Sequence, residues 1–263
     1  MTKAIFFDID GTLISMKTRK ISDALVDALY QLKENGIRLF IASGRPPVQL
    51  RLLDPKFTAF PWDGYVMMNG QYCLDENKEC IFSLPIKQET LEVLVPWLKT
   101  CDFACAILEK DYEYDLHFNQ SKYNYYKFLN KLDEMPKVHD PERMLTHTTY
   151  QICPYIPREQ DPEFLKHAPG LKSARWSDAF ADMIPENGGK PNGMKIMLER
   201  YGLEQKDSMA FGDGGNDITM LEFADIGVAM GNGRDDVKAA SDYVTADCED
   251  EGIIKALEHF HLL

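Results

Sequence analysis

Short apolar runs alternate with amphipathic helical stretches from the first residues to about residue 70, and the alternation returns after residue 185. The run at 4–7 is apolar throughout, which is typical of a buried strand. Ser22 then begins a stretch with apolar side chains at helical spacing, which ends at Gly36 before the next apolar run at 37–42. The alternation predicts βαβ units, and therefore an α/β fold built on a doubly wound parallel sheet.

Between about residues 71 and 184 the pattern changes, because Tyr and Phe are frequent and apolar segments are separated by polar turns such as 75–78 and 109–111. We expect an inserted α+β cap domain at 83–184 and a Rossmann-like catalytic core made of 1–82 and 185–263. The cap is predicted to contain helices at 89–100 and 122–132 and strands at 103–108, 150–153 and 179–184. The core is predicted to contain strands at 4–7, 37–42, 65–68, 208–211 and 226–230 and later helices at 191–201 and 217–223.

The chain is acidic, with 29 basic and 42 acidic residues and a formal net charge of -13. It contains no run of Lys and Arg that could follow a phosphate backbone, so we expect no nucleic-acid partner. An acidic protein that binds an anionic ligand must supply local positive charge, so a metal ion or a few placed cations are expected.

The six cysteines show no CxxC pair and no His at zinc-ligand spacing, which favours free thiols. The apolar run at 4–7 is too short for a signal-peptide core or a membrane span. We therefore expect a cytoplasmic protein without a membrane partner, either a monomer or a small homo-oligomer.

The first polar motif, residues 8–12 (DIDGT), follows the predicted strand at 4–7 directly. Open α/β sheets bind ligands at this carboxyl edge. Because residues two apart in extended backbone face the same side, Asp8 and Asp10 are expected to converge, and Gly11 permits the turn. A divalent cation would relieve their repulsion, while one carboxylate attacks a phosphorus centre and the other exchanges protons. Alone, the motif also fits a turn that caps the next helix.

Two shorter features follow the same logic. Residues 43–45 (SGR) come after the second predicted strand, where the Ser43 hydroxyl and backbone N–H groups such as that of Gly44 can hold phosphate oxygens. A plain strand-to-helix turn explains the same triplet. Lys190 precedes Pro191 at a predicted helix start, where a cation can neutralise phosphate charge. A solvated surface lysine is the alternative.

Residues 212–217 (GDGGND) are the most specific of the later segments and lie between a predicted strand and a predicted helix. Asp213, Asn216 and Asp217 supply hard oxygen ligands of the kind that Mg²⁺ prefers. A Rossmann nucleotide fingerprint is not satisfied, because position 217 is Asp where the pattern requires Gly.

These four segments, in this order, resemble the haloacid dehalogenase (HAD) superfamily, and in detail the Cof-type phosphatases with a C2B-type cap inserted between the second and third motifs. The resemblance covers nearly the whole chain, although the cap matches only by its position and its general residue pattern. One departure is Pro191, where the family often has Gly after its Lys.

The resemblance implies an aspartyl phosphate formed on Asp8 and proton transfer by Asp10, with Lys190 as the third catalytic residue. It implies a Mg²⁺ cofactor near four groups: Asp8, the main-chain carbonyl of Asp10, Asp213, and Asp217, which orients metal-bound water. It also implies that the phosphoryl group contacts Ser43, Gly44, Lys190 and Asn216. Asn69, at the cap junction, is expected to touch the substrate.

The resulting hypothesis is a Mg²⁺-dependent phosphatase for small phosphorylated metabolites, with sugar phosphates as the leading substrate class. A phosphomutase of the same superfamily is one alternative, because it would return the phosphoryl group to the substrate. A non-catalytic sugar-phosphate-binding protein is the other, although the presence of Asp8, Asp10, Lys190 and Asp213 argues against it.

Overall fold

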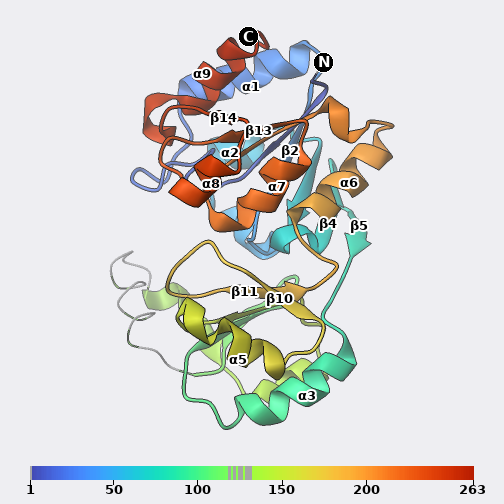
Figure 1. The fold of residues 1–263 in the computed structure, drawn as a ribbon, viewed down its shortest axis with the longest axis vertical. Helices are drawn as coiled ribbons and strands as arrows, with labels where there is room; N and C mark the ends of the chain where they lie inside the picture. Colours follow the sequence, from blue (N-terminus) through green and yellow to red (C-terminus); the bar gives the residue numbers. More distant parts are fainter. Residues whose placement is uncertain (1, 118–119, 121–122, 124–126, 128–131) are drawn as a thin grey trace. The chain divides into compact units, whose positions relative to one another are not determined.

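The computed structural model describes residues 2–117, 120, 123, 127 and 132–263 (Figure 1). It divides into two compact units, one made of Met1–Ser83 and Asn187–Leu263 and the other of Leu84–Glu186. The predicted boundaries, after residues 82 and 184, lie one and two residues from these. The roles expected for the two units, catalytic core and cap, stay predictions.

The first unit contains an eight-stranded sheet in the order β14-β13-β12-β1-β2-β3-β4-β5. All neighbours from β14 to β3 are parallel, while β4 and β5 are antiparallel additions at one edge. The predicted doubly wound parallel sheet is confirmed. Its strands are β1 (Ala4–Phe7), β2 (Arg38–Ala42), β3 (Gly64–Met67), β4 (Tyr72–Asp75), β5 (Cys80–Ser83), β12 (Ser208–Gly212), β13 (Ile226–Ala229) and β14 (Tyr243–Val244).

Helices cover this sheet on both faces. They are α1 (Asp23–Glu34), α2 (Pro55–Ala59), α6 (Lys190–Arg200), α7 (Ile218–Phe223), α8 (Asp235–Ala239) and α9 (Gly252–His259). Adjacent side chains of a strand point to opposite faces. Phe6 packs in a cluster with Met194 of α6 and Met220 of α7, whereas the ring of Phe7 contacts Trp62. Both sides of β1 are therefore buried, which explains its uninterrupted apolar sequence.

Helix α1 begins as predicted, because the Ser22 side chain accepts a hydrogen bond from the N–H of Leu25. Helix α6 differs from the prediction by one residue: Lys190 is its first residue and Pro191 its second. A proline fits either place, since the first-turn N–H groups have no partner within the helix.

The β4–β5 hairpin was not predicted, although the turn at 75–78 that joins its strands was. Each strand has only four residues, and a run this short carries too little periodicity to be recognised. The Asp75 side chain closes the turn by accepting from the N–H groups of Asn77 and Glu79.

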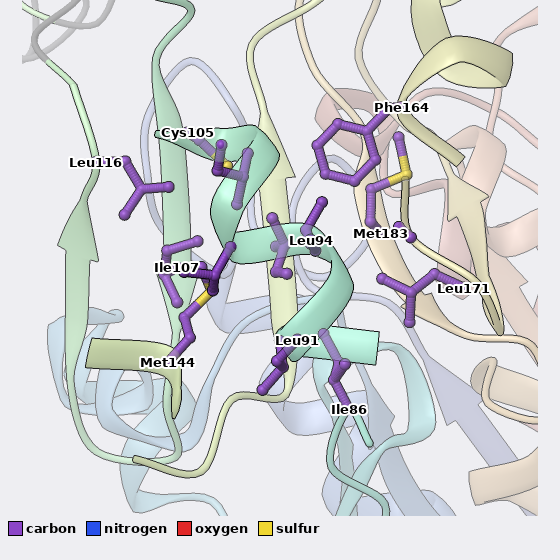
Figure 2. Close-up of a cluster of buried hydrophobic side chains, with 14 of the residues drawn as sticks. Ile86, Leu91, Leu94, Cys105, Ile107, Leu116, Met144, Phe164, Leu171 and Met183 are labelled. Carbon is purple, nitrogen blue, oxygen red and sulfur yellow. The ribbon is translucent and has the colours of Figure 1, made fainter. Parts of the chain in front are cut away.

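The second unit contains a six-stranded sheet in the order β10-β11-β9-β6-β7-β8. Figure 2 shows Leu91 and Leu94 of α3 beside Ile107 of β6 in its buried cluster, which also includes Phe164 of α5. Outside the segment 118–131, the helices of this unit are α3 (Gln88–Leu98) and α5 (Asp161–Lys166), and the strands are β6 (Cys105–Leu108), β7 (Glu113–Asp115), β8 (Lys137–Val138), β9 (Gln151–Pro154), β10 (Leu171–Ala174) and β11 (Asp182–Pro185). Most of the helix predicted at 122–132 lies outside the described residues, which include only 123, 127 and 132 of it.

The strand predicted at 179–184 was placed too early, since β11 begins at Asp182. The buried guanidinium of Arg175 donates to the main-chain carbonyls of Ser177 and Asp178. These bonds hold the segment before β11 in an irregular loop, so the apolar residues of that segment do not join the strand.

None of the helices in the described ranges combines the length and the apolar character needed to cross a lipid bilayer.

We predict that Gly193→Ala destabilises the protein. A Cβ atom at Gly193 in α6 would lie 2.2 Å from Cγ1 of Val66 on β3. Overpacking costs about 1–3 kcal/mol, which exceeds the gain of about 1 kcal/mol in helix propensity. Urea denaturation should show a net loss of about 1 kcal/mol in the free energy of unfolding. Lys195→Ala, at an exposed position of the same helix, is the control, and a stabilised Gly193→Ala variant would contradict the close approach.

Candidate active site

The order of the strands brings three of the predicted motifs to one edge of the sheet. β1 lies between β12 and β2, with Phe7 level with Phe211 and Ile41. Asp8 follows β1, Ser43 follows β2 and Asp213 follows β12, so the three polar segments leave the sheet side by side. This is where the strand order reverses, and open α/β sheets bind their ligands at such a point.

Three carboxylates meet at this edge. One oxygen each from Asp8, Asp213 and Asp217 lies within 4.8 Å of the other two. Asp8 is anchored by its N–H, which donates to the Phe211 carbonyl at 3.0 Å. Asp217 is fully buried, and its Oδ2 accepts from the N–H groups of Asp213 and Gly214 at 3.1 and 2.9 Å. Asp217 thus holds the loop that carries Asp213.

Lys190 connects two of these carboxylates. Its Nζ lies 2.6 Å from Oδ1 of Asp8 and 2.5 Å from Oδ1 of Asp217, and its side chain has no exposed surface. The alternative of a solvated surface lysine is therefore wrong. A buried ammonium is tolerated only when it is paired, and here it has two partners.

The site contains more negative than positive charge. Burial raises the pKa of the Asp8 carboxyl well above its ordinary value; Lys190 opposes this, and Asp217 and Asp213 add to it. Burial and then the charge of Asp217 raise the pKa of Asp213 to about 7. Burial alone would lower the pKa of Lys190, but Asp217 and Asp8 outweigh it and raise that pKa. The ammonium therefore stays charged, while the carboxyls still lack sufficient counter-charge.

A divalent cation fits this donor set. Asp8, Asp213 and Asp217 offer hard carboxylate oxygens, the ligand type that Mg²⁺ and similar ions bind. A doubly charged ion there would favour the ionised carboxylates that burial disfavours.

Asp10 is not part of this cluster of three carboxylates. Its two carboxylate oxygens accept from Nε and Nη2 of Arg45 at 2.5 and 2.7 Å, and Nη1 of Arg45 donates to Gln49. Arg45 belongs to the second motif, but no role was predicted for it. Its position directly after Ser43 and Gly44 indicated that it lies near the site, although sequence alone does not show which carboxylate it pairs with.

The remaining predicted phosphate-binding residues lie in the same unit. Ser43 is buried, and its Oγ accepts from the N–H of Arg45 at 3.2 Å, while Gly44 lies between them. Nδ2 of Asn216 donates to Oδ1 of Asn69 at 2.9 Å. The expected direct contact between Asn69 and substrate stays a prediction.

Two polar residues for which no role was predicted support the cluster of three carboxylates: Thr12, which belongs to the first motif, and Asn232. Thr12 Oγ1 donates to Oδ1 of Asp213 at 2.8 Å, and Nδ2 of Asn232 donates to the Gly11 carbonyl at 2.8 Å. Gly11 has φ +87°, and a Cβ there would lie 2.3 Å from Oδ2 of Asp213. Only glycine permits the first loop to approach Asp213 this closely.

A family model described as haloacid dehalogenase-like hydrolase matches residues 5–257. The chain belongs to the haloacid dehalogenase-like hydrolase family. Among solved structures, it is similar to the HAD subclass IIB sugar phosphatase BT4131, with a TM-score of 0.89, 35% identity and 100% of both chains covered. It is also similar to the HAD-superfamily phosphatase BT1666 from Bacteroides thetaiotaomicron, with a TM-score of 0.91, 31% identity and coverage of 100% of this chain and 96% of that chain.

A further relative is the 5-amino-6-(5-phospho-D-ribitylamino)uracil phosphatase YbjI of Escherichia coli (strain K12). It is 26% identical over 267 residues, which cover 97% of this chain and 95% of that protein. The predicted superfamily is confirmed. The predicted enzyme class, a HAD-type hydrolase with phosphatases as its relatives, is also confirmed.

We predict that Lys190→Met destabilises the metal-free protein by about 3 kcal/mol, because Asp8 and Asp217 would remain buried without their shared cation. Chemical denaturation in the presence of a chelator measures this change. Lys195→Met, at an exposed position of the same helix, is the matched control. Equal stability of the two variants would mean that the buried ion pairs contribute nothing to folding.

Proposed function

We propose that this HAD-family chain is a Mg²⁺-dependent phosphatase of small phosphorylated metabolites and that the carboxylate of Asp8 is its nucleophile. The observation that carries the proposal is the cluster of Asp8, Asp213 and Asp217, in which the buried Lys190 ammonium pairs with Asp8 and Asp217. Phosphoryl transfer depends mainly on positioning and on neutralising negative charge. This set of groups supplies an anchored oxygen nucleophile together with a fixed cation.

The proposed reaction has two displacements at phosphorus. In the first, an Asp8 oxygen forms a bond to phosphorus, the ester P–O bond breaks, and Asp10 gives a proton to the departing alkoxide. In the second, water attacks the aspartyl phosphate while Asp10 removes its proton, and inorganic phosphate leaves from Asp8. Lys190, Ser43, the N–H of Gly44 and Asn216 hold the phosphoryl oxygens throughout.

The ion pair with Arg45 constrains the proton transfer. Both oxygens of Asp10 accept a hydrogen bond from this guanidinium in the structure. For Asp10 to carry the proton that the leaving group needs, at least one of these bonds must be released. Both side chains are about one-quarter exposed, so the pair can rearrange when a substrate enters.

Mg²⁺ is the proposed cofactor because the donor set is made of carboxylate oxygens. Asp8 and Asp213 would hold it with the main-chain carbonyl of Asp10, and Asp217 would orient its water. When bound, the ion would offset the negative charge of the phosphate ester beside these carboxylates.

Sugar phosphates are the proposed substrate class. Two observations support it: BT4131, 35% identical over the full chain, is named a sugar phosphatase, and YbjI is named for a phosphorylated ribityl compound.

We predict that Asp8→Asn lowers kcat by at least about 10³-fold without unfolding the protein, because the amide cannot act as the nucleophile. The assay measures phosphate release from a panel of sugar phosphates, nucleotides and an aryl phosphate, with and without Mg²⁺. Asp27→Asn, an exposed change on α1, is the control. Turnover by Asp8→Asn at the wild-type rate would refute the nucleophile, and isomer formation from a hexose phosphate without phosphate release would indicate a mutase.

We predict that Asp213→Asn weakens Mg²⁺ binding by at least about 10-fold. Loss of a residue that only hydrogen-bonds to a metal ligand already costs roughly this much, and Asp213 is proposed as a ligand itself. Calorimetric titration of the substrate-free protein measures the affinity directly. The Asp27→Asn variant should bind Mg²⁺ as the wild type does. An unchanged affinity in Asp213→Asn would remove this residue from the proposed ligand set.

A further inference from the structure

The backbone just after β3 has an unusual conformation. Met68 and Asn69 have φ +51° and +52°, and Gly70 has φ +85°. Three successive residues are therefore in the left-handed region, where a non-glycine residue is disfavoured and a bulky one is a marked outlier. Such strain persists only where the surroundings determine it, and it concentrates at functional sites.

The surroundings of this left-handed turn, residues 68–70, are the predicted phosphate-binding segments. The N–H of Met68 donates to the Arg45 carbonyl at 3.0 Å, and the N–H of Asn69 donates to the Ser43 carbonyl at 2.9 Å. A Cβ at Gly70 would lie 2.1 Å from the Gly189 carbonyl oxygen, directly before Lys190. The turn is thus held by the Ser43 loop on one side and the start of α6 on the other.

The side chain of Asn69 extends this connection to the fourth motif. Asn69 is 1% exposed, and its Oδ1 accepts from Nδ2 of Asn216 at 2.9 Å, across 147 positions of sequence. An amide nitrogen carries two N–H groups in one plane. When Asn69 engages one of them, the rotation of the Asn216 side chain is restricted and the other N–H has a defined direction.

Asparagine suits this position for two separate reasons. It tolerates left-handed backbone better than other non-glycine residues, and its carbonyl oxygen is an acceptor. Glycine shares only the first property. The backbone requirement and the side-chain requirement can therefore be separated by substitution.

We infer that Asn69 is a positioning residue that orients the carboxamide of Asn216 toward the transferred phosphoryl group. The inference rests on the proposed function, in which Asn216 holds a phosphoryl oxygen. Asn69 acts through Asn216, and the left-handed turn places its side chain for this contact.

A double-mutant cycle tests the inference with Asn69→Gly, Asn216→Ala and the double variant. Asn69→Gly keeps the left-handed backbone and removes the acceptor. We expect it to raise both KM and the inhibition constant of inorganic phosphate by about 5-fold, within the range of a typical hydrogen bond. Because Asn69 acts through Asn216, the double variant should match Asn216→Ala within about twofold.

Asn77→Gly, in the exposed β4–β5 turn, is the matched control and should leave both constants unchanged. If Asn69 were merely structural, Asn69→Gly would lower the unfolding midpoint and kcat but leave KM unchanged. This result would overturn the inference. Additive effects in the double variant would overturn it too, while leaving the proposed phosphatase function intact.

If the wild type releases no phosphate, the proposed function fails. Calorimetric titration with inorganic phosphate then decides the positioning role by the same cycle. If Asn69→Gly binds phosphate as tightly as the wild type does, the positioning role is rejected. If Asn69→Gly binds phosphate more weakly, and the double variant binds it no more weakly than Asn216→Ala does, the role is supported.

Discussion

The structure of the candidate active site depends on one buried ammonium that lies between two buried carboxylates. Lys190 contacts Asp8 and Asp217, and Asp213 completes the acidic group. Removing charges from water is costly, and pairing offsets this only when the geometry is good. Because Asp217 also accepts from the backbone of the Asp213 loop, this ammonium ties together the end of β1, the start of α6 and the loop after β12.

The close approach of these segments requires backbone without side chains at a few points. A Cβ at Gly212 would lie 2.5 Å from Cβ of Asp217, and one at Gly11 would overlap the Asp213 carboxylate. Glycine is unfavourable in regular structure because it loses more conformational freedom on folding. The glycines therefore carry an entropic cost, but they allow the loops to pack close enough to form hydrogen bonds with one another.

Sequence reasoning predicted the sheet and the meeting of the motifs because both follow from general rules. A buried apolar run indicates a parallel strand, and polar residues after such strands share an edge. It did not predict the partner of each side chain. The pairing of Asp10 with Arg45 was not foreseen, because rotamers and loop paths are set by tertiary packing. The roles of Thr12 and Asn232 were missed for the same reason: their hydrogen bonds reach across 201 and 221 positions of sequence.

The different environments of the two carboxylates of the first motif support different roles for them. Asp8 is buried beside a lysine that has no exposed side-chain surface. Its position is therefore fixed, as a nucleophile requires. Asp10 lies in a more exposed place against a guanidinium that is itself one-quarter exposed. A group that donates and removes protons must change its partners during the reaction, and only the more exposed carboxylate can do so without leaving a buried charge unpaired.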